Sequence, residues 1–125
     1  MTVPCNRRYL VGMADTEGIA SWLRRGTLEY CVLALLGKGT RYGVELVRDL
    51  AADPALSATE GTLYPLLSRL RRTGWVETTW RESPAGPPRR YYSLTEEGKR
   101  ALDRFRHEWV AFRDAVDRVM GTDSR

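Results

Sequence analysis

The sequence has little of what most enzymes use for catalysis. It contains one histidine and two cysteines in 125 residues, and no Cys/His cluster has the spacing of a metal site. No glycine-rich loop follows a strand into a helix, as a phosphate-binding loop requires. His107 falls on the outer side of a predicted helix and is interpreted as a solvated surface residue. We therefore expect that the protein is not an enzyme and that it binds no cofactor and no metal.

A disulfide framework and long apolar runs are also missing. Cys5 and Cys31 show no framework spacing, so both are interpreted as free thiols of a reducing cytoplasm. The apolar patch from Tyr9 to Ala14 ends at Asp15, too early for a signal-peptide core. No run approaches the roughly 20 apolar residues that cross a bilayer. We expect a soluble cytoplasmic protein without a membrane partner.

Length and charge indicate one small domain with a local basic excess. The chain is 42% hydrophobic, which is enough for a small core. Its net charge is +4, and most of the excess lies in residues 57–94, which hold six arginines against three glutamates. This placement fits contact with nucleic acid. Eighteen of the 20 basic residues are arginine, and either bidentate contacts to phosphate and guanine or a GC-rich genome explains that preference.

Residues 57–74 have the pattern of one amphipathic helix. Ser57 and Glu60 have the spacing of a capping box, and Gly74 stands where a left-handed cap would end the helix. Pro65 removes one helical hydrogen bond and its ring presses on the carbonyl of Gly61, so we expect a kink or an irregular first turn. Four leucines at i, i+3, i+4 and i+7 must face a core: Leu63, Leu66, Leu67 and Leu70.

The opposite face of this helix is polar and carries no acid. Gly61 and Pro65 lie on it together with hydroxyl and arginine side chains. Positive charge and hydroxyls suit a helix that lies against phosphates and base edges, although any surface helix has a polar face. The candidate DNA-binding residues of this helix and its entry are Ser57, Thr59, Thr62, Tyr64, Ser68, Arg69 and Arg72.

A β-hairpin is predicted directly after the helix. Trp75–Arg81 alternates with period two and is rich in aromatic and β-branched residues, which indicates a strand. Glu82–Pro88 is predicted as a loop because its prolines interrupt a strand, and Arg89–Leu94 as the second strand. Arg89 and Arg90 would then stand at the hairpin tip and contact the flanking DNA backbone or the minor groove. A basic outward helix followed by such a hairpin describes a winged helix-turn-helix.

Two helices are predicted before this unit. Trp22–Leu36 is apolar on more than one side, and Pro54 ends the next helix, Arg41–Ala52. Arg41 and Tyr42 would lie near the DNA backbone. Helix, short turn and second helix is the order of a helix-turn-helix. Four residues of the second helix are predicted to face inward: Val44, Val47, Leu50 and Ala51.

The last helix carries a long apolar seam. Thr95 is predicted as its N-cap, and two glutamates favour its positive first turn. About 25 residues is longer than so small a core can cover, so the seam is predicted to pair with a second copy; packing on its own domain is the alternative. The seam residues, at spacings of three and four, are Leu102, Phe105, Trp109, Phe112, Val116 and Val119.

The predicted fold is mostly α with a small β-hairpin. It divides into an N-terminal arm without clear period (1–20), a winged helix-turn-helix (21–94), a dimerisation helix (95–120) and a flexible tail (121–125). Three large aromatics in the seam would hold two helices apart, and such a gap would suit a flat aromatic ligand. A well-filled aromatic core without a ligand is the alternative.

Taken together, these motifs resemble the PadR-type transcriptional regulators. The resemblance rests on residues 61–70, 74–76 and 86–98, and residues 23–36 and 41–46 are similar to the same family's first two helices. It implies a winged-helix repressor that dimerises through its last helix and binds a palindromic promoter site. By position it implies DNA contacts at Tyr42, Thr62, Tyr64, Arg69, Arg89 and Arg90.

The resemblance further implies an effector, because some members release DNA on binding a phenolic compound or a planar drug. The short last helix is similar to that of the smaller subfamily, whereas residues 1–20 depart from the family pattern. A winged helix used only for protein contacts is the second class of function, and it would not need arginines collected on one side. By position, the residues implied to line a cavity for the effector are Leu23, Gly26, Tyr30, Phe105 and Trp109.

Overall fold

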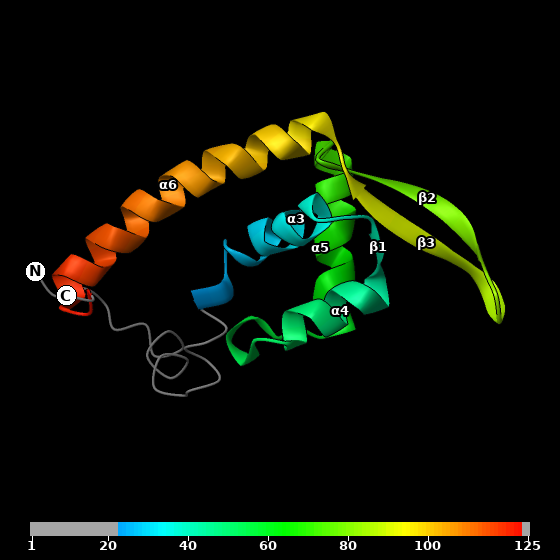
Figure 1. The fold of residues 1–125 in the computed structure, drawn as a ribbon, viewed down its shortest axis with the longest axis horizontal. Coiled ribbons are helices and arrows are strands. Elements are labelled where there is room, and N and C mark those ends of the chain that lie inside the picture. Colours follow the sequence, from blue (N-terminus) through cyan, green and yellow to red (C-terminus); the bar gives the residue numbers. More distant parts are fainter. Residues whose placement is uncertain (1–22, 124–125) are drawn as a thin grey trace, which may run out of the picture.

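The computed structural model describes residues 23–123 (Figure 1). Within that range four α-helices and a three-stranded antiparallel sheet of order β1-β3-β2 confirm the predicted fold class. A short 3-10 turn, Pro54–Leu56, connects α4 to α5. The elements are α3 (Leu28–Gly37), β1 (Arg41–Tyr42), α4 (Gly43–Ala51), α5 (Glu60–Thr73), β2 (Val76–Ser83), β3 (Gly86–Leu94) and α6 (Glu96–Met120).

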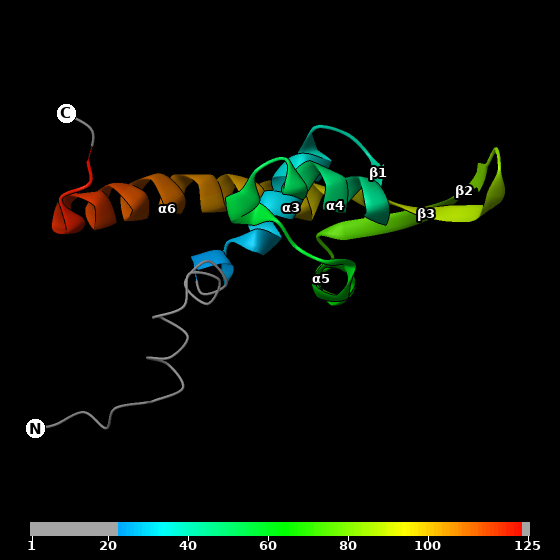
Figure 2. The ribbon, with the colours of Figure 1, turned by 90° about the horizontal axis from the view of Figure 1, so that it is seen from below.

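The core is made mainly of leucines from three helices. The four leucines of the predicted α5 stripe are all buried, which confirms the phase of that helix. They meet Leu33 of α3 and Leu46 and Leu50 of α4, while Val76 and Tyr92 close the core from the sheet. Figure 2 views α5 almost along its axis and shows it at the edge of the fold, beside the base of the hairpin. The opposite face of α5 is therefore left open.

Helix α5 starts later than predicted. Thr59, not Ser57, is the N-cap, and its hydroxyl oxygen accepts a hydrogen bond from the backbone N–H of Thr62 at 3.3 Å. Ser57 instead ends the 3-10 turn, so the predicted capping box with Glu60 is wrong. Gly74 has φ +90° and ends the helix as predicted. One helix runs through Pro65, as expected.

The first helix is also shorter than predicted, because its predicted beginning contains a turn. Gly26 has φ +84°, which a glycine adopts without steric cost. The hydroxyl of Thr27 donates to the carbonyl oxygens of Leu23 and Arg24, at 3.2 and 3.1 Å. A continuous helix therefore begins only at Leu28. Trp22 lies outside the described residues.

The second helix begins at Gly43, because Arg41 and Tyr42 form β1 and pair with β3. Its inward face was predicted correctly only in part. Leu50 is buried and Val47 packs against the core as predicted, whereas Val44 is 42% exposed, Ala51 is exposed, and Leu46 is buried without having been predicted. The phase follows from Gly43, where a Cβ would collide with the ring and hydroxyl of Tyr64. This glycine allows α4 to approach α5 along the 43-46-50 face.

The hairpin is longer than predicted and its turn is tighter. Strands β2 and β3 leave only Pro84 and Ala85 between them, so the predicted loop Glu82–Pro88 is wrong. Pro87 and Pro88 are tolerated in β3 because β1 covers only Tyr91 and Tyr92 on one edge, and on the other edge the register with β2 is irregular between Arg81 and Ser83. Arg89 and Arg90 pair with Arg81 and Trp80, and are not at the tip.

Helix α6 is capped and extended as predicted. The Thr95 hydroxyl oxygen accepts from the Gly98 N–H at 3.0 Å, and the helix runs 25 residues to Met120. Only its first turns are buried, at Gly98, Ala101 and Leu102. Beyond them α6 projects from the helical body in the direction opposite to the hairpin (Figure 1).

Candidate nucleic-acid interface and the groove beside α6

The outward face of α5 carries the predicted DNA-binding residues on one exposed surface. Tyr64 is 37% exposed, at the shoulder of the helix next to α4. Burial raises the pKa of the Tyr64 phenol above its usual range, and the charge of Glu60 adds to this shift. The hydroxyl therefore stays protonated near neutral pH and can donate a hydrogen bond. The other predicted DNA-binding residues of α5 and its entry are also exposed: Ser57, Thr59, Thr62, Ser68, Arg69 and Arg72.

Arg69 has a partner that the sequence did not reveal. Its Nε–H donates to Glu29 Oε1 at 2.7 Å, and its Nη2 lies against the same oxygen. The Arg69 side chain is 53% exposed and that of Glu29 25%. The carboxylate holds the guanidinium at the edge of α5 and neutralises part of its charge. Arg72, on the same face, forms no ion pair with any residue in the described range.

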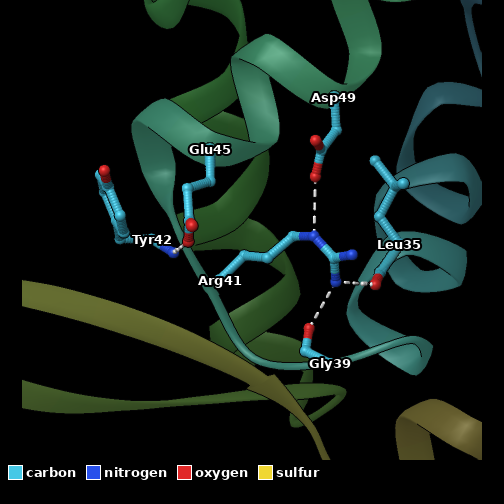
Figure 3. A network of polar contacts seen from close by, with 6 residues as sticks. All are labelled: Leu35, Gly39, Arg41, Tyr42, Glu45 and Asp49. Atoms are coloured by element: carbon cyan, nitrogen blue, oxygen red, sulfur yellow. Dashed lines mark hydrogen bonds and ion pairs between the residues drawn. The ribbon is translucent and has the colours of Figure 1, made fainter.

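Arg41 is engaged inside the fold (Figure 3). Its Nε–H donates to Asp49 Oδ2 at 2.7 Å, and its Nη1 donates to the carbonyls of Gly39, at 2.7 Å, and Leu35. The guanidinium thus ties the end of α3 to α4. The contact of Arg41 with the DNA backbone stays a prediction. In the structure its guanidinium is already bound to groups of the same chain.

Each arginine of the wing, the β2–β3 hairpin, is stacked on an aromatic ring. The guanidinium carbon of Arg90 lies 4.9 Å from the centre of the Trp80 ring, and that of Arg89 4.5 Å from the centre of the Tyr42 ring. Arg81 lies over Tyr91 on the same hairpin. Stacking restrains side chains that would otherwise be flexible. Trp80 is 63% exposed and was not among the predicted site residues, although its register opposite Arg90 makes it a natural partner.

The second candidate site is a groove beside α6. It has a volume of about 680 Å³ and is lined by the segment before α3, by the 3-10 turn and by α6. Three of the residues predicted to bind an effector, Leu23, Phe105 and Trp109, line this groove together with Phe112 and Val116. Tyr30 is not among the lining residues, because its ring stacks on Phe105 at 4.1 Å. Gly26 lines a different hollow, beside α5.

The apolar seam of α6 continues outward from this groove. Leu102 is 4% exposed and belongs to the monomer core, so it is not available to a partner. Further along the seam, exposure is high at Trp109 (37%), Phe112 (63%) and Val116 (42%), and reaches 88% at Val119. The aromatic rings form a continuous series, with Phe105 5.9 Å from Trp109 and Trp109 6.4 Å from Phe112. No described part of the chain covers this face.

The histidine and cysteine side chains of the described residues form no metal or catalytic site. His107 is exposed, and the described residues contain no group of His, Cys, Asp and Glu that could hold a metal ion. Burial raises the pKa of the half-buried Cys31 thiol, which keeps it in the unreactive protonated form. Cys5 lies outside the described residues. Among the helices from residue 23 to residue 123, none has the length and hydropathy of a membrane span.

Comparison with known proteins agrees with this architecture. An uncharacterised protein of Lysinibacillus sphaericus is 28% identical over 104 residues, which are 82% of this chain and 95% of that protein. The crystal structure of a PadR family transcriptional regulator from Eggerthella lenta is 36% identical with a TM-score of 0.74, covering 86% of this chain and 93% of that one. A PadR-like transcriptional regulator from Bacillus cereus is 31% identical with a TM-score of 0.72, over 79% and 96% of the two chains.

The family model named "Transcriptional regulator PadR-like family" matches residues 32–104. This range runs from α3 through the whole wing into α6 and covers more than half of the chain. The protein therefore belongs to the PadR-like family of transcriptional regulators, which bind DNA and are not enzymes.

Proposed function

We propose that this PadR-like regulator is a homodimeric repressor that binds a palindromic promoter operator and releases it when a small aromatic ligand binds beside α6. The observation that carries the proposal is the division of the molecule into two exposed surfaces. Polar and basic residues gather on α5 and the wing, and apolar residues on the free part of α6. A protein with this function acts in the cytoplasm, where promoter DNA lies.

DNA binding is supported by the open face of α5. A helix with exposed hydroxyls and arginines at the edge of the fold fits the major groove, and the wing beside it is placed to follow the adjacent backbone. Arg69 and Arg72 supply charge from the helix and Arg89 and Arg90 from the wing. Two subunits would present their α5 helices about 34 Å apart, one turn of DNA, and a palindromic site matches that symmetry.

Dimer formation is supported by the uncovered seam. Phe112, Val116 and Val119 expose apolar side chains at helical spacing on the part of α6 that projects from the body. A continuous apolar stripe of this kind indicates a protein interface. Its large aromatic residues favour packing against the partner's groove over a narrow two-stranded coil.

Effector binding is supported by the size and lining of the groove. Its volume of about 680 Å³ lies within the usual 300 to 1,000 Å³ of small-molecule sites. The Trp109 and Phe105 rings offer flat apolar faces to an aromatic compound. Such a ligand lowers the affinity for DNA only as far as it binds the DNA-free arrangement more tightly.

The proposal is tested by sequencing the DNA fragments that the purified protein retains, with and without candidate aromatic compounds. Retention of fragments sharing an inverted repeat, and their loss on adding one compound class, is the expected result. A protein that retains no fragment and sediments as a monomer at all concentrations would contradict DNA binding and dimerisation together. A winged helix that acts only through protein contacts would retain no DNA fragment.

A further inference from the structure

A third hollow lies between the wing and the two helices of the helix-turn-helix. This wing pocket has a volume of about 470 Å³ and is lined from β1, α4, α5, β2 and β3. Its side chains include Tyr42, Tyr64 and Trp80 and three arginines: Arg48, Arg89 and Arg90. Arg48 and Trp80 were not among the predicted DNA-binding residues, so the pocket adds two residues to that set.

The charge of the wing pocket is uncompensated. None of the described residues that line it is acidic, whereas the hollow beside α5 contains Glu29 and the groove beside α6 contains Asp117. The guanidinium groups of Arg48, Arg89 and Arg90 form no ion pair with any described residue. The nearest acids along α4 are committed elsewhere, since Glu45 accepts from the Tyr42 N–H at 3.1 Å and Asp49 accepts from Arg41. Arg48 and Arg89 are exposed and Arg90 is half-buried, so three positive charges in one solvent-accessible hollow favour binding of an anion.

Two of the three guanidinium groups are held in place for such an anion. Arg90 is stacked on Trp80, and its Nε is buried with no hydrogen-bond acceptor among the described residues. The stack and the burial fix the plane of the guanidinium, which leaves its terminal amino groups as the donors that a ligand can reach. Arg89 is held against Tyr42 in the same way. Planar groups fixed in this manner suit bidentate contact with phosphate oxygens.

Neutral donors complete the lining. Gly43 and Val44 line the pocket in the first turn of α4, where backbone N–H groups have no partner within the helix and favour an anion. The protonated Tyr64 hydroxyl lies against Gly43, at a distance that only a glycine permits.

From these observations we infer that the wing pocket binds a single phosphate of the DNA backbone, held jointly by Arg48 of α4 and Arg90 of the wing. The inference rests on the proposed DNA-binding function and adds residues and a partner group to it. A phosphate at this point ties the wing to the helix-turn-helix, and so sets the angle at which α5 enters the groove. Since a phosphate carries no base identity, the contribution is the same for every DNA sequence.

The test compares Arg48→Gln, Arg90→Gln and the double variant with Arg81→Gln. Arg81 is the matched control, because it is a wing arginine stacked on a ring but does not line the pocket. Affinity for a retained duplex is measured from 50 to 200 mM salt, concentrations over which a phosphate contact is visible as a change of slope. In a plot of log affinity against log salt concentration, the slope for the double variant should be smaller in magnitude by about 0.9 for each bound subunit. That difference corresponds to one phosphate contact per subunit. Arg81→Gln should change the slope by less than half of that.

A second arm identifies the phosphate. Each backbone phosphate of a half-site is replaced in turn by an uncharged methylphosphonate. At one position the parent protein should lose affinity while the double variant loses none, and at all other positions the two should respond alike. Circular dichroism verifies that the variants are folded, and Arg48→Lys, which keeps the charge, should retain the slope.

These measurements distinguish failure of the proposed DNA binding from failure of the proposed phosphate site. If the parent protein binds no duplex, the proposed function and the inference both fail. If it binds and the double variant behaves as Arg81→Gln does, the inference alone is overturned. A change in slope that corresponds to two phosphate contacts per subunit would also overturn the inference, because Arg48 and Arg90 would then bind separate phosphates. Saturable binding of free inorganic phosphate or a nucleoside monophosphate that the double variant abolishes, without a change in duplex binding, would assign the pocket to a free ligand instead.

Discussion

Replacing Phe112 by serine tests the α6 interface at its most informative position. The ring is 63% exposed in the monomer, so its loss should change the fold's own stability by less than about 0.5 kcal/mol. Leu102 and Phe105 are poorer choices, because Leu102 belongs to the core and Phe105 stacks on Tyr30. A change at Phe112 therefore acts on association rather than on folding.

The expected size follows from the exposed part of the ring. Burying a complete phenylalanine side chain contributes about 1.5–3 kcal/mol, so covering the exposed two-thirds contributes roughly 1–2 kcal/mol. A symmetric dimer buries two copies, and losing both costs about 2–4 kcal/mol. Because 1.4 kcal/mol is tenfold in an equilibrium constant, Phe112→Ser should raise the dimer dissociation constant roughly 30- to 700-fold.

Sedimentation equilibrium over a range of concentrations measures this constant. Val110→Ser is the matched control, since Val110 is 47% exposed on the same helix but lies outside the seam. The control should dimerise as the parent does. A Phe112→Ser protein with the parent's dissociation constant, or a control that is equally weakened, would refute the assignment of the seam as the interface.

Three further predictions concern the other surfaces. Arg69→Ala should weaken operator binding and lower the salt slope by about one phosphate contact, whereas Glu29→Gln should strengthen binding by freeing the guanidinium; unchanged affinity in both would remove this pair from the interface. Gly43→Ala should destabilise the fold because its Cβ meets an aromatic ring, while Gly61→Ala, on the open helix face, should stabilise it by about 0.5–1 kcal/mol; thermal unfolding that ranks them the other way contradicts the packing. With the other three tryptophans replaced by phenylalanine, fluorescence of Trp109 should be quenched by an aromatic effector that releases DNA, and a release without any fluorescence change would place the effector elsewhere.

Local patterns predicted the fold where the structure depends on neighbours in sequence. The leucine stripe of α5 and the Thr95 cap of α6 each involve residues within a few positions of one another, and both are confirmed. Strand β1 could not be foreseen in this way, because Arg41 and Tyr42 pair with residues about 50 positions later, and two residues carry no period. The wing was predicted too short because proline breaks a strand only where a neighbouring strand needs its N–H. Pro87 lies beyond the end of β1 and opposite the register irregularity of β2 between Arg81 and Ser83.

The same division between local and distant contacts applies to the site. The exposed side of α5 follows from the opposite leucines, so its residues were predictable one by one. Glu29 was not, because it reaches Arg69 from 40 residues away on another helix. The pairing of Trp80 with Arg90 was not predicted either, because it depends on the register of the two strands, which the structure gives as Trp80 opposite Arg90 and Arg81 opposite Arg89. What the sequence does not contain is the packing of that hairpin face against α4, and this packing makes a pocket of the arginines.

The anchoring of α6 determines how the groove could act on DNA. The helix is buried only through Leu102, and Phe112 lies ten residues further on, about 15 Å along the axis. A ligand in the groove would contact α6 on this free part and the body at Leu23 and Leu56. It would therefore change the angle between α6 and the body and leave the α5 face as it is. In the proposed dimer, where α6 sets the distance between the two α5 helices, a change of that angle is sufficient to take them out of register with one turn of DNA.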